Sequence, residues 1–361
     1  MKINKKIYNL LGTGGQSLIS RTKYSLGLKP RVNPDFYHQK KPGSIYPFLF
    51  RSCIIISADL ELAWGWNHAK GQADPISHAK NQAQQTRENF PEIMHMFHKY
   101  EIPVTWATIG HLFLDKCRKK NGLIHPEILR LPYFTNEFWQ YKSDDWFDSD
   151  PTSDHKSAPE WYAPDLIRQI TDSPVKHEIA CHTFSHINMS EKVCPSEVAE
   201  SELEACKKAA ESQNIKLRSF VFPGNIVGNI QELKNAGIKS YRLNTGYELD
   251  YPRRDKLGIW QIPGGICLEK PPLNWSNEYW LNILKKYVKT ALNTGTICHF
   301  WFHPSMNPEN IKNILEPLLE YIYIIRSSDQ AWITTMSSLT EWLDQRTEEQ
   351  TDTKKQTLLL C

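Results

Sequence analysis

The sequence predicts an α/β fold built on a mainly parallel sheet, with enough strands to form a barrel. From residue 51 onward, short β-branched or aromatic runs alternate with helical patterns, which is typical of parallel sheets. The number of such runs, seven or eight, suits a barrel. The chain has 361 residues, and one barrel of about 250 residues with extensions fits this length as well as two domains do.

The expected elements follow one another regularly along the chain. Long helices are expected over residues 76–100, 195–213, 277–293 and 308–325, with a short one between residues 225 and 239. Strands are expected over residues 51–59, 103–110, 177–184, 219–225, 239–244, 258–264, 296–304 and 331–336. We therefore expect the barrel to occupy residues 51–345, preceded by an extension over residues 1–50.

A loop insertion over residues 133–165 interrupts this alternation. It holds five aspartates between residues 144 and 154, together with the aromatic residues Trp139, Tyr141, Trp146, Phe147, Trp161 and Tyr162. Aromatic faces beside acids suit a sugar-binding wall, and a packed lid over the barrel mouth explains them equally well. The polar tail over residues 346–361 is predicted to be disordered.

Composition favours a soluble protein of a reducing compartment. Hydrophobic residues make up 40% and charged residues 23%, which argues against disorder over most of the chain. The eight cysteines form no CxxC pair, and several lie in apolar runs, so we expect reduced thiols rather than disulfides. The first residues make a poor signal peptide, and no apolar stretch reaches 18 residues. A cytoplasmic location is the expectation, at the inner face of the membrane if the N-terminal extension contacts it.

Basic charge is concentrated in the N-terminal extension. Residues 1–50 hold nine Lys or Arg against one acid, Asp35, whereas the rest of the chain holds 34 against 39. A solvated extension is the favoured explanation. Attraction to an anionic membrane face or an anionic lipid-linked substrate is the alternative, at about 1 kcal/mol per basic group near such a surface. Nucleic-acid binding is not expected, because the extension lacks interleaved aromatic residues and any recognisable module.

Four of the predicted strands end in residues that carry chemistry. In parallel barrels the catalytic groups gather at the carboxyl ends of the strands. These ends carry acids in IIISADLE, histidines in IACHTFSH, Pro-Gly-Asn in FVFPGN and His303 in ICHFWFHP. Residues at these positions are therefore the candidates for an active site.

His182 and His186 stand four positions apart where an apolar strand ends. Neutral imidazoles are zinc ligands, and a catalytic zinc site keeps one coordination position for water. An HxxxH pair alone is more often two buried core histidines than a metal site. Acids and a further histidine at the other strand ends strengthen the metal hypothesis.

Asp59 and Glu61 are two positions apart, so in an extended strand both side chains project from the same face. Two buried carboxylates without partners would be costly. One explanation is that one of them binds a metal while the other takes a proton from water. A salt-bridged pair at the strand end is the alternative.

His303 follows Trp301 and Phe302, which would shield a neutral imidazole able to act as a general acid. A single histidine on an apolar strand is more often a core residue. His299, four positions earlier, fits a core or supporting role.

The order of these motifs resembles the polysaccharide deacetylases, the NodB-homology or carbohydrate esterase family 4 group. The similarity spans about residues 51–335, and HTFSH is its most specific part. The resemblance implies a distorted seven-stranded (β/α) barrel of the NodB type. It also implies a divalent metal, usually zinc, held by one Asp and two His, and removal of an N-acetyl or O-acetyl group from a sugar.

Residue by residue, the resemblance implies that His182 and His186 bind the metal and that Asp59 is the catalytic base. The family's metal-binding Asp would fall on Leu60, so Glu61 is the expected third ligand, with Asp59 as the alternative.

The third motif also departs from the family pattern. Its usual Arg before Pro-Pro is absent, because Phe222 and Pro223 stand there, and we expect Arg242 to replace it. Asn225 is the expected oxyanion donor, and His303 the general acid that protonates the leaving nitrogen.

A metal-dependent deacetylase of a sugar precursor is the function expected from this resemblance. Because no export signal is predicted, a nucleotide-sugar or lipid-linked glycan of surface-polysaccharide biosynthesis is the expected substrate. A metal-free amidohydrolase of the same fold acting on a small cyclic amide, or a non-catalytic glycan-binding relative, are the alternatives.

Overall fold

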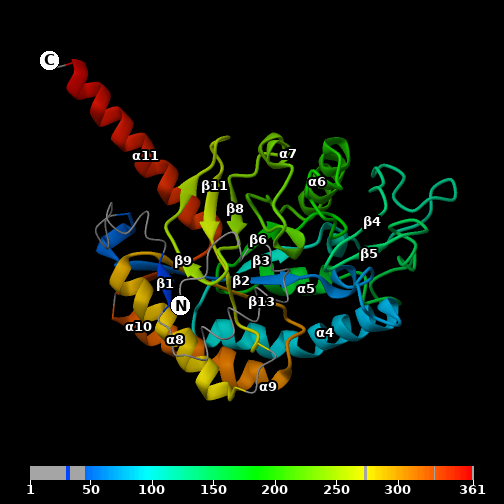
Figure 1. Ribbon diagram of the computed structural model, residues 1–361, viewed down its shortest axis with the longest axis horizontal. Coiled ribbons are helices and arrows are strands. Elements are labelled where there is room, and N and C mark those ends of the chain that lie inside the picture. The colour runs from blue at the N-terminus through cyan, green and yellow to red at the C-terminus, as the bar shows by residue number, and fades with distance from the viewer. Residues whose placement is uncertain (1–29, 33–44, 272–274, 329, 360–361) are drawn as a thin grey trace, which may run out of the picture.

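The computed structural model describes residues 30–32, 45–271, 275–328 and 330–359 (Figure 1). In its central sheet, all described strands except β10 (Arg253–Arg254) run parallel, and helices separate most of them along the chain. The strands that line the barrel are, in chain order, β2 (Ser52–Leu60), β3 (Thr105–Thr108), β6 (Glu178–Cys181), β7 (Ser219–Phe220), β8 (Ser240–Leu243), β11 (Trp260–Pro263) and β13 (Ile297–Phe302). The predicted parallel α/β fold is confirmed.

The order of strands in this sheet is that of a curled, incompletely closed barrel. It runs β11, β8, β7, β6, β3, β2, β13 and β12 (Ile266–Cys267), with the antiparallel β10 (Arg253–Arg254) beside β11. The eighth predicted strand, β14 (Ala331–Thr334), pairs with the first half of β2, whereas β3 pairs with the second half. The end strands β11 and β12 are joined directly through Gly264 and Gly265, and no ladder between them occurs among the described residues. The barrel is therefore distorted.

The predicted helices occur close to their expected positions. They are α4 (Pro75–Lys99), α6 (Ser196–Glu211), α7 (Ile230–Asn235), α8 (Asn277–Thr294) and the continuous run of α9 (Pro308–Asn310), η5 (Ile311–Leu315) and α10 (Glu316–Ser327). Helix α5 (Pro164–Thr171) was not predicted. Short 3₁₀ turns are η1 (Pro47–Leu49), η2 (Leu62–Gly65), η3 (Gly110–Phe113) and η4 (Pro223–Asn225). Local chemistry sets the ends: Asp74 caps α4 by accepting from the Ser77 amide, and Gly295 ends α8 with φ of 74°.

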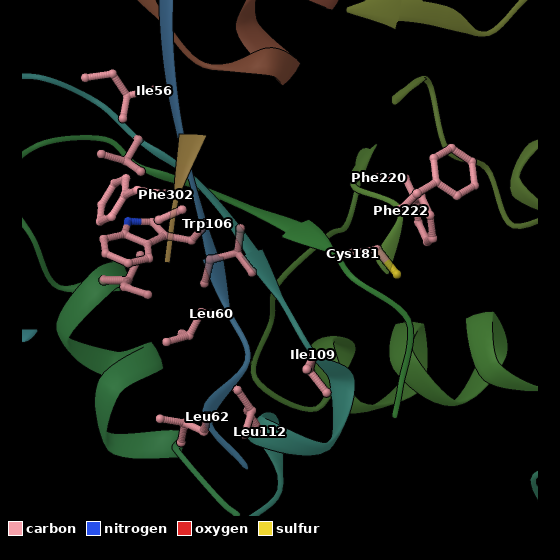
Figure 2. Packing of buried hydrophobic residues seen from close by; sticks show 14 of the residues in the cluster. Ile56, Leu60, Leu62, Trp106, Ile109, Leu112, Cys181, Phe220, Phe222 and Phe302 are labelled. Carbon is pink, nitrogen blue, oxygen red and sulfur yellow. The ribbon is translucent and has the colours of Figure 1, made fainter. Parts of the chain in front are cut away.

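Strand β2 is buried along its whole length, and its two faces pack into different clusters. Ile54 and Ile56 belong to the main core shared with Trp106 and Phe302 (Figure 2). Cys53 and Ile55 belong to a second cluster. Because side chains alternate along a strand, Asp59 has the same orientation as Cys53 and Ile55 and the opposite one to Ile56.

The 133–165 insertion forms a packed cover that includes the short hairpin of β4 (Phe134–Thr135) and β5 (Gln140–Tyr141). Its aromatic residues Trp139, Tyr141, Trp146, Phe147, Trp161 and Tyr162 are all buried. They therefore act as packing groups, as the lid explanation expects, and do not present an open stacking wall.

The structure describes only part of the N-terminal extension and most of the C-terminal tail. Of the basic extension over residues 1–50, the part over 1–29 and 33–44 lies outside the described residues; β1 (Arg31–Val32) pairs with β9 (Glu248–Leu249). The tail, expected to be disordered, continues helix α11 (Met336–Leu359), which projects from the body in Figure 1. None of the described helices is long and apolar enough to cross a bilayer.

Candidate active site

Three donor atoms converge at the carboxyl ends of β2 and β6. His182 follows β6 directly, and Glu61 follows β2. His186 has a left-handed backbone with φ of 62°, which turns the chain back toward the barrel. Glu61 Oε1 lies 3.1 Å from His182 Nε2 and 3.1 Å from His186 Nε2, and all three side chains are buried.

This donor set fits a divalent metal. His182 Nδ1 donates a hydrogen bond to the Val221 carbonyl at 2.7 Å, so the neutral ring presents a lone pair at Nε2 toward the Glu61 carboxylate. His186 Nδ1 is buried without a hydrogen-bond partner within the described residues, and His186 Nε2 faces the same Glu61 oxygen at 3.1 Å. Two imidazole nitrogens and a carboxylate oxygen facing one point are the ligand set of catalytic zinc. A cation between them would satisfy all three.

Asp59 lies beside this cluster and is paired with Arg242 of β8. Both terminal guanidinium nitrogens of Arg242 donate to the carboxylate at 2.7 Å, and Arg242 also donates to Ser57 Oγ at 3.0 Å. Burial by itself raises the pKa of Asp59, but Arg242 outweighs this effect and the pKa lies below its usual value. The pair thus keeps Asp59 ionised inside the barrel.

Two further residues named in the sequence analysis, Asn225 and His299, lie near Arg242. Asn225 of η4 accepts a hydrogen bond from Arg242 through Oδ1 at 3.2 Å, which places it at the same edge of the sheet. His299 is buried with Nε2 2.9 Å from Ser57 Oγ, and burial together with Arg242 lowers the pKa of His299 to about 3. His299 therefore supports Ser57 as a neutral core residue.

His303 follows β13 and lies on the other side of Glu61, with Nε2 3.8 Å from Glu61 Oε1. Its Nδ1 lies 2.6 Å from Glu269 Oε1, which also accepts from the His303 amide at 3.1 Å. Burial lowers the pKa of His303, but Glu269 and Glu61 outweigh it and raise the pKa to about 10. Half-buried Trp66 and Trp301 flank the ring at 5.5 and 5.4 Å between centroids.

Glu269 and Glu202 are positioning residues that the sequence analysis missed. Glu269 follows β12, so the rule that polar residues ending strands are candidates would have found it. Glu202 lies on the buried face of α6 and accepts from the amides of Phe184 and Ser185 at 2.8 and 2.9 Å and from Ser185 Oγ at 2.6 Å. These bonds fix the loop between His182 and His186. The sequence signal for Glu202 was an acidic residue at a position of the helix that faces the core.

The curled (β/α) barrel carries these groups at the carboxyl ends of its strands, the edge where such barrels place their active sites. Residues 80–240 match the family model for polysaccharide deacetylases, the family that the motifs of the sequence resemble. The matched segment contains both histidines of HTFSH and lies between β2 and β13. A search of curated proteins found no match.

Solved structures share the fold at low sequence identity. A Mycobacterium smegmatis protein assigned as a polysaccharide deacetylase is 14% identical with a TM-score of 0.60, over 85% of this chain and 95% of the other. A Pseudomonas aeruginosa protein with the same assignment is 13% identical with a TM-score of 0.59, over 85% and 95%. An allantoinase is 14% identical with a TM-score of 0.59, over 85% and 94%. These likenesses support the NodB-type barrel as a fold.

Proposed function

We propose that this protein is a metal-dependent hydrolase that removes an acetyl group from the nitrogen, or from an oxygen, of a sugar. The observation that carries the proposal is the convergence of His182 Nε2 and His186 Nε2 on one oxygen of Glu61, beside the Asp59–Arg242 pair. Glu61, His182 and His186 would hold the metal. Zinc is the metal that this nitrogen-and-oxygen donor set suits best.

Each remaining residue has a task that follows from its position. The metal, when bound, would polarise the acetyl carbonyl and make water acidic enough to react near neutral pH. Asp59, kept ionised by Arg242, accepts the proton of that water. The backbone N–H of Asn225 is bonded to the Phe222 carbonyl and its Oδ1 accepts from Arg242, so the side-chain NH₂ is the group that would donate to the developing oxyanion. His303, held by Glu269, donates a proton to the leaving nitrogen.

An acetylated sugar is the proposed substrate class. Trp66 and Trp301 are half-buried on either side of His303, and aromatic faces of this kind stack on sugar rings. We further propose that the sugar is carried by a nucleotide or a lipid in surface-polysaccharide biosynthesis. The basic residues at the N-terminal end of the chain would favour such an anionic carrier, and with a lipid-linked one would bring the enzyme to an anionic membrane surface.

Release of acetate tests the proposal. Wild-type protein supplied with zinc is expected to release acetate from N-acetylglucosamine oligomers or UDP-N-acetylglucosamine, and Glu61→Ala is expected to release none above background. His95→Ala, which changes an exposed histidine of α4, is the matched control and should retain full activity. Hydrolysis of a small cyclic amide that persists after chelation would instead favour the metal-free amidohydrolase. Sugar binding without turnover would favour a glycan-binding relative.

The Glu269–His303 pair predicts a shift in the pH profile. Removing the negative charge by Glu269→Gln should lower the pKa of His303 by about 1–3 units. A general acid must be protonated, so activity is lost as pH rises through this pKa, and the alkaline limb of kcat/KM should move to lower pH. Glu278→Gln, at an exposed position of α8, is the control. An unmoved alkaline limb would remove His303 from the acid role.

A further inference from the structure

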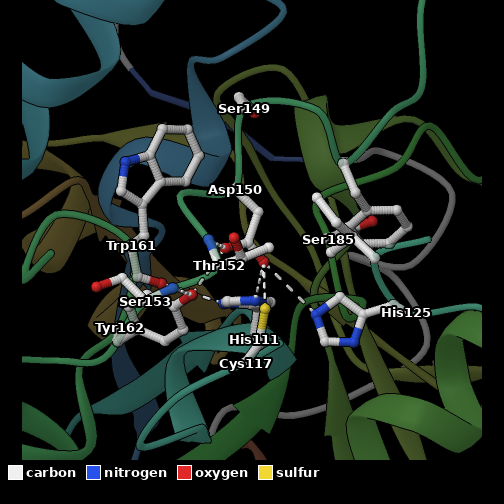
Figure 3. Close-up of polar contacts among 12 residues, drawn as sticks. His111, Cys117, His125, Ser149, Asp150, Thr152, Ser153, Trp161, Tyr162 and Ser185 are labelled. Atoms are coloured by element: carbon white, nitrogen blue, oxygen red, sulfur yellow. Dashed lines mark hydrogen bonds and ion pairs between the residues drawn. The ribbon is translucent and has the colours of Figure 1, made fainter. Parts of the chain in front are cut away.

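A second group of metal-ligand side chains lies outside the catalytic site, where the 133–165 insertion meets the segment that follows β3 (Figure 3). His111 comes from η3 at the end of β3, Cys117 and His125 from the loop that follows, and Asp150 from the insertion. One ligand atom from each of the four residues lies within 4.8 Å of all the others. Asp150 Oδ2 is the common point: it lies 2.8 Å from His111 Nε2, 3.0 Å from Cys117 Sγ and 3.6 Å from His125 Nε2.

The polar atoms of these side chains that point away from the cluster, here called the outer atoms, already have partners elsewhere. Asp150 Oδ1 accepts from the Tyr162 hydroxyl at 2.7 Å and from the Thr152 amide at 2.8 Å. His111 Nδ1 faces the Trp161 carbonyl at 3.2 Å, and His125 Nδ1 faces a carboxylate oxygen of Glu127 at 3.4 Å. Metal-binding histidines are oriented in this way, with the second nitrogen bonded to a carbonyl or a carboxylate.

The inner atoms are the four ligand atoms that face one another, and their hydrogen bonds to one another do not give each of them a partner. His125 Nε2 has no hydrogen-bond partner within the described residues, although only 9% of the His125 side chain is exposed. His111 has an acceptor at each nitrogen, the Trp161 carbonyl and the Asp150 carboxylate, and a neutral imidazole carries only one N–H. A cation among the four inner atoms would satisfy both rings.

We propose that His111, Cys117, His125 and Asp150 form a second metal site, which binds zinc and serves the structure rather than catalysis. Four protein donors close the tetrahedral coordination of zinc, as in structural sites, and leave no position for water. Sulfur and imidazole donors together favour zinc over magnesium or calcium. Tetrahedral zinc with such ligands places its donors roughly 3–4 Å apart, which is compatible with the observed spacing.

This site connects the insertion to the loop that carries the catalytic histidines. The amides of Gly110 and His111 donate to the carbonyls of Thr183 and Phe184 at 2.8 and 2.9 Å. The Phe184 ring packs against both site histidines, with centroids 5.5 Å from His111 and 5.0 Å from His125. A metal here fixes the cover and the HTFSH loop together, so its loss should weaken both.

Metal counting and cobalt substitution test the second site in the full-length protein. Wild-type protein loaded with zinc is expected to hold two ions per chain by elemental analysis, and His182→Ala one. With Co²⁺ in place of zinc, His182→Ala should show an intense thiolate-to-cobalt charge-transfer band, because the catalytic site contains no cysteine. Cys117→Ser should lose this band and one ion, whereas Cys194→Ser, the control, should keep both.

The outcomes separate this inference from the proposed function. One ion with the thiolate band in His182→Ala establishes the second site whatever the catalytic site does. Wild-type and His182→Ala proteins that show no thiolate band with cobalt would overturn it, even if Cys117→Ser fails to fold. A wild-type protein with a single ion and no band would leave the catalytic metal as the one bound and equally reject the second site.

Discussion

Replacing His182 by alanine is expected to remove the catalytic metal and to lower kcat/KM by about 10³-fold or more. Metal polarisation of a carbonyl contributes several kcal/mol to the transition state, and each 1.36 kcal/mol corresponds to about tenfold in rate. His182 is held by the Val221 carbonyl with Nε2 directed at Glu61, so no neighbouring side chain replaces it. The measurement is metal content together with acetate release, and the variant should contain one ion per chain fewer than the wild type.

Three further variants assign the two acids. Glu61→Ala should lose the same ion as His182→Ala, because both histidines converge on its carboxylate. Asp59→Asn should keep that ion and lose about 10²–10⁴-fold in turnover, as expected when a general base is removed. His95→Ala should match the wild type in both measurements. Full metal content in His182→Ala would reject the ligand assignment, and metal loss in Asp59→Asn alone would exchange the roles of the two acids.

Replacing Arg242 by methionine is expected to lower the free energy of unfolding by about 3–5 kcal/mol and to abolish most activity. The side chain of Arg242 is fully buried, and its loss leaves the Asp59 carboxylate in the interior without its partner. Without the guanidinium, burial would raise the pKa of Asp59, which makes the ionised form of the base harder to maintain. Denaturant unfolding and acetate release are the measurements, with Arg118→Met at an exposed position as the control.

The pairing of Arg242 with Asp59 can be isolated by combining changes. In an Asp59→Asn background, Arg242→Met should lower the free energy of unfolding markedly less than it does in the wild type, because no buried charge is left unpaired. The pKa of Asp59 is lower in the folded than in the unfolded protein, so the pair stabilises fully above the ordinary Asp pKa and less as pH falls through the folded value. The stability gap between wild type and Arg242→Met should therefore narrow in acid. An equal loss of unfolding free energy in the wild-type and Asp59→Asn backgrounds would contradict the pairing.

Much of the fold could be predicted because its signals are local. The alternation of apolar strands and amphipathic helices in the chain reappears as β2, α4, β3 and their successors, within a few residues of the expected bounds. The run FVFPGN was the least accurate, since β7 contains only Ser219–Phe220. Pro223 lacks an amide to donate, and Asn225 adopts a left-handed backbone, so the ladder ends early.

The candidate site was predicted in part for a similar reason. Polar residues that end apolar runs identified Asp59, Glu61, His182, His186 and His303, because the ends of parallel strands meet at one edge of the sheet. Which of the two acids faces the histidines could not be predicted from the sequence. Glu61 faces both histidines while Asp59 faces Arg242, and this follows from side-chain directions that spacing in the sequence does not contain.

Periodicity and short motifs were enough to predict the parallel α/β architecture, the resemblance to polysaccharide deacetylases and the strand ends that carry chemistry, because such signals depend on near neighbours in the chain. Which distant groups meet depends on how the chain folds. Arg242 reaches Asp59 across 183 positions of the chain, and Glu269 reaches His303 across 34. His111, Cys117, His125 and Asp150 share no recognisable spacing, and they come together because Asp150 of the insertion packs against the segment that follows β3. Such contacts depend on packing between separate elements, which a linear pattern does not specify.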